Sequence, residues 1–167
     1  MPILNGNLEW SQFDRNPEIR NAFNGVPAKT LLPSGAMLCR FITTETAKKE
    51  YADSGIYSSP WWTEWGTTAK MLGRWQTATV KPIDVIRARL AVTGKFSAKL
   101  DSLVQIILTQ PVYAWKGSAR HQEDDDLKLT YLGGGEQLFL PNLVSDKKSL
   151  SCSVAYLHCF TSIDSLV

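Results

Sequence analysis

The chain has 167 residues, of which 44% are hydrophobic and 20% charged, a composition that argues against disorder and fits one globular domain spanning residues 1–167. The formal net charge is only +2 and the basic residues are scattered, so no nucleic-acid-binding surface is indicated. The three cysteines, Cys39, Cys152 and Cys159, lack a CxxC spacing, so we expect buried thiols rather than disulfides or a zinc site.

Targeting signals are not apparent in the sequence. The first residues show no basic stretch followed by an apolar run, and no segment approaches the roughly 18 apolar residues of a membrane helix. We therefore expect neither a signal peptide nor a transmembrane segment. The domain is expected to act in a cytoplasm, either that of the producing cell or that of a target cell.

Residues 1–33 are predicted to form a helical extension packed on the core. Between Glu9 and Phe23, apolar side chains such as Trp10 recur among polar ones, which is typical of short amphipathic helical pieces. Pro17 divides this segment into two, because proline lacks the backbone N–H group that a continuous helix needs.

A turn signal precedes Ala36–Ile42, a short apolar run that predicts a buried strand. Arg40 is unusual inside this strand, because a buried guanidinium is costly unless a carboxylate neutralises it or an anionic ligand binds it. Both interpretations of Arg40 stay open. A short, solvent-facing helix is predicted over Glu45–Asp53, ending before Gly55.

The second half of the chain consists mainly of predicted strands. Period-2 alternation predicts a half-exposed strand over Asp84–Val92, and Ser97–Leu108 is compatible with either a helix or a strand. Further strands are predicted at Val112–Gly117, Glu136–Pro141 and Ser151–Phe160. Many strands and few helices indicate an α+β fold with a mostly antiparallel sheet and a few short helices.

Polar stretches separate some of these strands. Glu123–Asp126 is acidic and is expected to be a solvated loop. Gly133–Gly135 is expected to be a flexible turn that leads into the strand beginning at Glu136. His121 and His158 are isolated from each other and from any cysteine at ligand spacing, so no metal site is predicted.

Three separated segments carry a family resemblance: Leu38–Phe41, Gly55–Pro60 and Gly133–Pro141. In this order and spacing they resemble the ADP-ribosyltransferase superfamily, which implies a twisted or split antiparallel sheet. In that family an arginine on the first core strand binds the phosphates of NAD. A serine-containing strand shapes the nicotinamide pocket, and an acidic residue on a late strand contacts the nicotinamide ribose. The resemblance implies NAD as the substrate and no metal.

The family's late motif places Gln137 where the catalytic glutamate of a transferase stands. The segment Gly134–Gln137 is similar to the Gly-Gly-x-Gln motif of necrotizing-toxin (TNT) type NAD glycohydrolases, which pair it with an arginine. The resemblance therefore implies a toxin or effector enzyme that hydrolyses NAD, with Arg40, Gln137 and Glu136 as catalytic residues. In a regular strand Glu136 points to the face opposite Gln137, so it enters the same site only through a bulge.

The chemistry of NAD cleavage suits these residue types. The ribose–nicotinamide bond breaks through an oxocarbenium-like state, and the planar fork of Arg40 fits pyrophosphate oxygens. Gln137 can hold a ribose hydroxyl but cannot act as a base, so water is the expected nucleophile. The residues expected to contact NAD are Arg40, Phe41, Tyr57, Ser58, Ser59, Trp61 and Trp62.

Two other functions stay open. A mono-ADP-ribosyltransferase would modify a protein acceptor, whereas a non-enzymatic domain would bind a protein through the aromatic segment Tyr57–Trp65, and a toxin would also have a neutralising immunity protein. The tryptophans of this segment are more often core residues than stacking platforms. If NAD is the ligand, we expect Arg40, Ser59 and Gln137 to line one cleft, whereas dispersed positions would leave only the partner-binding alternative.

Overall fold

The computed structural model describes residues 2–43, 45, 59–75, 79–80, 82–91, 100, 102–125, 128–143 and 154–162. Among these residues, seven strands form one sheet in the order β1-β5-β8-β3-β2-β4-β9 with antiparallel neighbours, and β6 and β7 form a separate two-stranded sheet. The strands are β1 Ala28–Leu32, β2 Met37–Ile42, β3 Trp61–Glu64, β4 Ser102–Leu108, β5 Val112–Ser118, β6 Gln122–Asp124, β7 Leu129–Tyr131, β8 Glu136–Phe139 and β9 Val154–Ser162. The helices are η1 Trp10–Gln12, α1 Pro17–Ala22, α3 Trp65–Trp75 and α4 Pro82–Leu90. The predicted α+β class with a mostly antiparallel sheet is confirmed.

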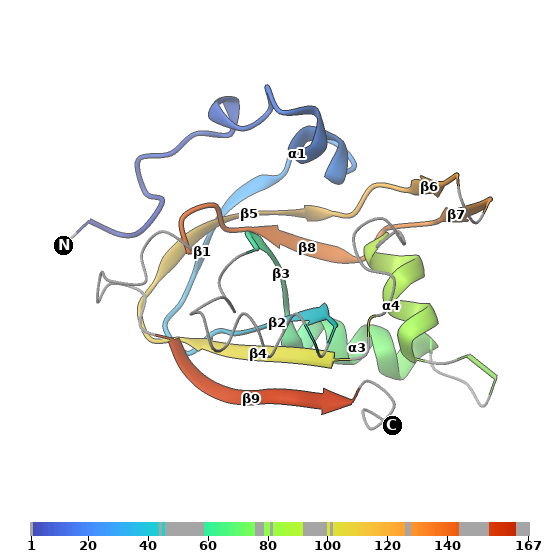
Figure 1. The fold of residues 1–167 in the computed structure, drawn as a ribbon. Helices are drawn as coiled ribbons and strands as arrows, with labels where there is room; N and C mark the ends of the chain where they lie inside the picture. The colour runs from blue at the N-terminus through green and yellow to red at the C-terminus, as the bar shows by residue number, and fades with distance from the viewer. Residues whose placement is uncertain are drawn as a thin grey trace.

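The large sheet is strongly bent, so that its two halves face each other (Figure 1). In that view β1, β5 and β8 lie above, β2, β4 and β9 lie below, and β3 runs between them. We call the face between the halves the inner face and the opposite one the outer face. Alternate residues of the strands fill the inner face with one apolar core, which comprises Leu32, Leu38, Trp62, Val104, Ile106, Leu108, Val112, Ala114, Leu138, Leu140 and Leu143.

The N-terminal segment covers the outer face of β5, β8 and β3. Its apolar side chains pack against the outward-facing rings of these strands in an aromatic cluster, which comprises Leu8, Trp10, Phe13, Ile19, Phe23, Trp61, Trp115 and Phe139. Pro17 stands at the first position of α1, and the Asn16 side chain accepts a hydrogen bond from the Glu18 backbone N–H at 2.9 Å, so the predicted division at Pro17 is confirmed. The last part of the predicted helical extension differs, because Ala28–Leu32 forms an edge strand of the sheet.

Helices α3 and α4 cover the outer face of the other half of the sheet. Phe41 of β2 packs with Leu72 of α3 and with Val85 and Ile86 of α4 in a second apolar cluster. Cys39, on the same face of β2, is fully buried and donates a hydrogen bond to Thr68 Oγ1 of α3 at 3.7 Å. The predicted buried thiol is therefore confirmed at Cys39, and Cys152 and Cys159 are not among the residues whose side chains are described.

The strand predicted over Asp84–Val92 is wrong, because Pro82–Leu90 forms helix α4. Pro82 fits the first helical turn, where a missing N–H costs nothing, and Asp84 in that turn interacts favourably with the helix dipole. Val85 and Ile86 are buried one turn after Pro82, which is helical spacing. The apparent period of two came from the half-buried Arg87 and Arg89, which are interleaved with a helical apolar stripe.

The structure also tests the remaining predicted strands and the predicted acidic loop. The strands predicted over Ala36–Ile42, Val112–Gly117 and Glu136–Pro141 are confirmed, and the ambiguous Ser97–Leu108 forms a strand from Ser102. The strand predicted over 151–160 corresponds to β9. The acidic stretch is not simply a solvated loop, because Glu123 lies in β6 and Asp124 is only 2% exposed.

Helix α3 was not predicted from the sequence. Of the predicted helix at Glu45–Asp53, Glu45 is helical and exposed, and residues 46–53 lie outside the described residues. Within the described ranges, no helix has both the length and the apolar character required to span a membrane.

Candidate functional site

Arg40 lies on the inner face of β2, in the middle of the sheet. It follows the buried Leu38 by two residues, and its guanidinium carbon lies 5.5 Å from the ring centroid of Trp62 on the neighbouring strand β3. Arg40 is only 6% exposed. A cation over an indole face in a buried setting is a favourable contact, so packing contributes to holding the arginine in place.

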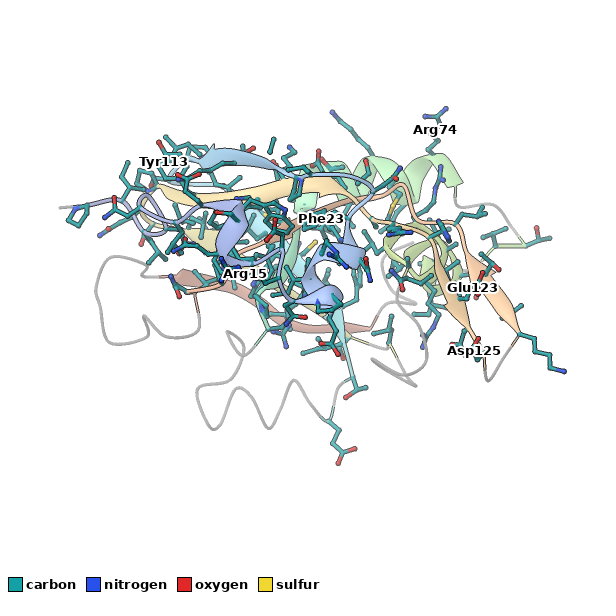
Figure 2. The ribbon with its side chains drawn as sticks, turned by 90° about the horizontal axis from the view of Figure 1, so that it is seen from above. Arg15, Phe23, Arg74, Tyr113, Glu123 and Asp125 are labelled. Carbon is teal, nitrogen blue, oxygen red and sulfur yellow. The ribbon has the colours of Figure 1, made fainter. Side chains whose placement is uncertain are left out.

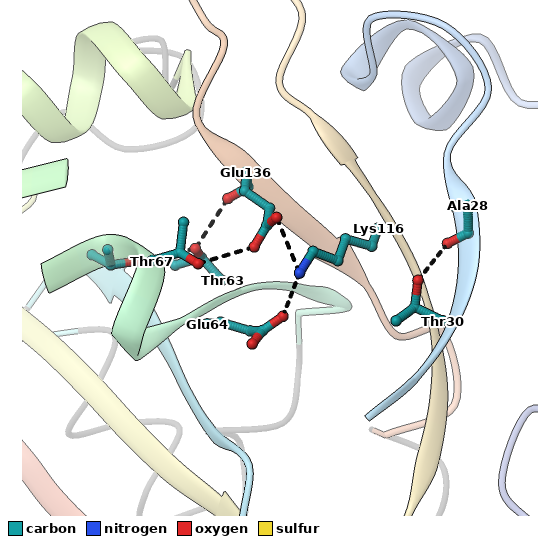
Figure 3. Close-up of polar contacts among 8 residues, drawn as sticks. Ala28, Thr30, Thr63, Glu64, Thr67, Lys116 and Glu136 are labelled. Carbon is teal, nitrogen blue, oxygen red and sulfur yellow. Dashed lines mark hydrogen bonds and ion pairs between the residues drawn. The ribbon is translucent and has the colours of Figure 1, made fainter. Parts of the chain in front are cut away.

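Three charged side chains meet on the same inner face, and we call them the carboxylate–lysine cluster: Glu64 of β3, Lys116 of β5 and Glu136 of β8 (Figure 3). Lys116 Nζ lies 2.8 Å from Glu64 Oε1 and 3.0 Å from Glu136 Oε2. The side chains are 27% to 32% exposed, so solvent or a ligand can reach them. One ammonium therefore bridges two accessible carboxylates from different strands.

Strand register places this cluster on the same face of the sheet as Arg40. Glu64 is the direct partner of Leu38, and Lys116 is the direct partner of Leu138, both of which are buried in the inner core. Directly paired residues of an antiparallel sheet project from the same face, and so do residues two apart in a strand. Arg40 and the carboxylate–lysine cluster therefore share the inner face.

The first turn of α3 fixes the carboxylate of Glu136. Thr67 Oγ1 donates a hydrogen bond to Glu136 Oε1 at 3.1 Å, and Thr63 Oγ1 donates to the Glu136 carbonyl at 3.0 Å. Thr63 also pairs with the buried Thr68 hydroxyl at 3.0 Å, which in turn accepts from Cys39. Both the backbone and the side chain of Glu136 are thus tied to the junction of β3 and α3.

The titration of two groups near this junction is shifted. Burial lowers the pKa of Lys116, but its hydrogen bonds to Glu64 and Glu136 outweigh burial and raise that pKa above its ordinary value. The ammonium therefore stays charged at neutral pH. Burial raises the pKa of Cys39 to about 12, against the smaller opposing effect of its bond with Thr68, so Cys39 is a neutral thiol and not a nucleophile.

Gln137 lies on the outer face, away from Arg40. Its Nε2 donates a 2.6 Å hydrogen bond to the carbonyl of Ala22, the last residue of α1. Alternation along β8 is regular, and it turns Glu136 rather than Gln137 toward the inner face. The expected trio of Arg40, Ser59 and Gln137 is therefore not brought together on one face, so the NAD site predicted from the motifs is not assembled with that composition. Arg40 and Glu136 share the inner face instead, without a bulge.

The glycines before β8 have a packing role. Gly133 has φ of +70°, and a Cβ there would lie 2.4 Å from the Ala119 carbonyl oxygen. Gly135 donates its N–H to the Arg89 carbonyl at 2.8 Å, and a Cβ there would lie 2.6 Å from that same oxygen. The glycines thus let the chain pass between the end of α4 and the end of β5, so that Glu136 lies at the start of β8.

The remaining predicted contacts of NAD are distributed over both faces. Ser59 accepts a 3.2 Å hydrogen bond from the Trp61 backbone N–H and so shapes the entry to β3. Phe41 lies on the outer face, and so does Trp61, whose ring is 4.9 Å from that of Phe139. Trp62 is 2% exposed in the inner core, so its ring is a core element beneath Arg40. Tyr57 and Ser58 lie outside the described residues.

Sequence reasoning missed Glu64, Thr67 and Lys116. The available signal was a lysine inside the apolar strand Val112–Ser118, which calls for a paired carboxylate as Arg40 did. Three other charged side chains are peripheral: Figure 2 shows Arg74, Glu123 and Asp125 at the rim of the molecule. The carboxylate–lysine cluster differs from them because it lies between the two halves of the sheet.

Comparison with known proteins bears on the fold. The chain is similar to a solved structure described as Tne2 in complex with Tni2, with a TM-score of 0.55 and 11% sequence identity, over 84% of this chain and 96% of that chain. No protein-family model matches the sequence. None of the curated proteins matches it either. At this level of identity the likeness shows a shared fold.

Proposed function

We propose that this protein cleaves the bond between nicotinamide and ribose in NAD, as an NAD glycohydrolase of the toxin type that its motifs resemble. The observation that carries the proposal is the placement of Arg40 and the Glu136 carboxylate on one face of a bent antiparallel sheet. An arginine can bind the pyrophosphate of NAD, and an acid on another core strand can bind its ribose. The fold shared with Tne2 is compatible with this proposal.

Glu136 takes the role that the sequence motif gave to Gln137. When the C1′–N bond breaks, its electron pair goes to the nicotinamide nitrogen, and the ribose carbon becomes cationic. A carboxylate beside that carbon stabilises the cation and accepts a hydrogen bond from a ribose hydroxyl. Each oxygen of Glu136 has a second lone pair left after its bond to Thr67 or Lys116.

Water is the proposed acceptor, and Glu64 supplies a second carboxylate near it. The oxygen of water bonds to C1′ and loses a proton, which a neighbouring carboxylate can accept. Glu64 and Glu136 contact the same lysine nitrogen, so both lie within one small region. Hydrolysis in this scheme needs no metal and no protein acceptor.

A mono-ADP-ribosyltransferase is the second candidate, and the position of Glu136 supports it. The inner face presents the carboxylate of Glu136 rather than the amide of Gln137, and an acid on a late strand is what the transferases use. A carboxylate can orient a side-chain nucleophile of a protein as well as a water molecule. The two candidates share Arg40 and Glu136 and differ in the acceptor.

Release of free nicotinamide from NAD, without any added protein, tests the proposal. We expect release by the wild type and a loss of about 100-fold or more in Glu136→Gln, because the amide is neutral. Glu123→Gln, an exposed glutamate of β6, is the matched control and should retain full activity. If the wild type leaves NAD intact alone but labels a protein with ADP-ribose, the transferase replaces the hydrolase. If it does neither, both assignments fail.

A protein partner is part of the proposal. Tne2 was solved in complex with Tni2, so a protein with this fold forms such a complex. We propose that this chain is likewise bound by a protein that neutralises it. A candidate partner is expected to stop nicotinamide release at a one-to-one ratio, and an unchanged rate at saturating partner would contradict neutralisation.

A further inference from the structure

Lys116 joins two carboxylates that would otherwise repel each other. Its Nζ lies 2.8 Å from Glu64 Oε1 and 3.0 Å from Glu136 Oε2, and it comes from β5, whereas the carboxylates come from β3 and β8. β8 is hydrogen-bonded to both of the other strands, so the three side chains project from adjacent strands of the inner face. The lysine side chain is 31% exposed.

Among the residues that the structure describes, β2, α3 and α4 also carry cationic side chains in this part of the molecule. From β2, Arg40 shares the inner face but lies over Trp62. From α4, the Arg89 guanidinium lies 3.8 Å from the position of a Cβ at Gly134. From α3, Thr67 contributes a neutral hydroxyl, and Lys70 is exposed. Among the described side chains, Lys116 is the cation in direct contact with both Glu64 and Glu136.

We propose that Lys116 is a positioning residue of the site, whose ammonium keeps Glu64 and Glu136 ionised together and holds the Glu136 carboxylate toward the reacting ribose. The proposal rests on the function proposed above. Two carboxylates that both contact one nitrogen lie close enough to repel each other when ionised, so removing the cation between them would favour protonation of one of them. A protonated Glu136 would lose the negative charge that stabilises the cationic sugar.

The raised pKa of Lys116 agrees with this role. The hydrogen bonds to Glu64 and Glu136 raise this pKa against the opposing effect of burial, so both acids stabilise the charged form of the lysine. The second tie of Glu136, through Thr67, fixes the orientation of its carboxylate but carries no charge. Orientation and ionisation are therefore supplied by different residues, which allows them to be separated by mutation.

A carboxyl titration followed by carbon NMR tests the bridge without any reference to NAD. In Lys116→Met, which keeps the apolar stem, we expect one midpoint of the Glu64–Glu136 pair to move up by about one pH unit or more relative to the wild type. Lys116→Arg should keep the wild-type titration, because it keeps the charge. Adding Glu64→Gln to Lys116→Met should return the Glu136 midpoint toward the wild-type value. Unchanged midpoints in Lys116→Met would overturn the proposal.

The pH profile of nicotinamide release tests the catalytic consequence. The acid limb should shift to higher pH in Lys116→Met by about the same amount as the NMR midpoint, and it should keep the wild-type position in Lys116→Arg. Lys70→Met, an exposed lysine of α3, serves as the control for loss of a positive charge. An acid limb that stays in place while the NMR midpoint moves would contradict the positioning role.

The two measurements separate failure of this inference from failure of the proposed function. If the wild type releases no nicotinamide at any pH but the NMR midpoint shifts, the NAD assignment falls and the ionic bridge stands. If the wild type is active and the midpoint does not shift, the assignment stands and the bridge falls. Should Lys116→Met fail to fold, biphasic coupled titration of Glu64 and Glu136 in the wild type would by itself contradict the proposed bridge.

Discussion

The two faces of β5 and β8 carry opposite kinds of surface. On the outer face Trp115 and Phe139 are 1% and 3% exposed and pack with the rings of the N-terminal segment. On the inner face Lys116 and Glu136 keep about a third of their side-chain surface open. Neighbouring residues in the sequence thus differ completely in environment, because alternate residues of a strand point in opposite directions.

This contrast indicates how stability and chemistry are divided in the molecule. The outer face gains stability from apolar area and ring contacts, such as the 5.0 Å separation of the Phe13 and Trp115 rings. The inner face has the same kind of core at one end and a charged cluster at the other. Mutations on the outer face should therefore change folding, and those of the carboxylate–lysine cluster should change activity.

The largest expected effect comes from the outer face. Trp115→Ala should lower the free energy of unfolding by about 3–5 kcal/mol, the usual cost of removing a buried tryptophan. Activity per folded molecule should be unchanged, because Trp115 points away from Arg40 and Glu136. Denaturant unfolding measures the first quantity and nicotinamide release the second. Val26→Ala, at a side chain that is 81% exposed, is the control and should stay within about 0.5 kcal/mol of the wild type.

Local patterns predicted much of the sheet. The apolar run at Ala36–Ile42 and the glycine-led segment at Glu136–Pro141 were identified as strands because their patterns depend on nearby residues only. Helix α4 was misassigned because a nine-residue helix and a short strand can share an alternating pattern. Deciding between them required knowing which residues pack against β2.

The site could be predicted only in part. Arg40 was recognised because a guanidinium in an apolar strand needs an explanation, and the alternation of Glu136 and Gln137 was correctly expected. Contacts between residues far apart in the sequence decide whether Glu136 or Gln137 lies on the same face of the sheet as Arg40. Gln137 binds a carbonyl 115 residues earlier, and Lys116 binds a carboxylate 52 residues earlier. Patterns within one strand carry no information on such partners.

An intermediate effect is expected at the buried cation of the inner face. Arg40→Lys should weaken NAD binding by about tenfold or more, because lysine keeps the charge but loses the planar fork, and a charge-assisted hydrogen bond contributes about 1.5–3 kcal/mol. The free energy of unfolding should fall by less than the free energy of NAD binding, because lysine can also lie over Trp62. Calorimetric titration with NAD compares the two proteins. Arg74→Lys, at the rim of α3, should bind as the wild type does, and equal affinity in Arg40→Lys would exclude the phosphate role.

The smallest effect is expected at Gln137, the outer-face neighbour of Glu136. Gln137→Ala removes the hydrogen bond to the Ala22 carbonyl, which should cost about 1 kcal/mol of unfolding free energy. The cost stays small because the same carbonyl also accepts the Arg120 backbone N–H at 2.9 Å and is not left unsatisfied. Nicotinamide release should persist, since the side chain points toward α1 and away from Arg40. Loss of activity in a stably folded Gln137→Ala protein, together with retained activity in Glu136→Gln, would mean that the ribose contacts the outer face instead. Catalysis would then be assigned to the outer face of the sheet rather than to the inner face.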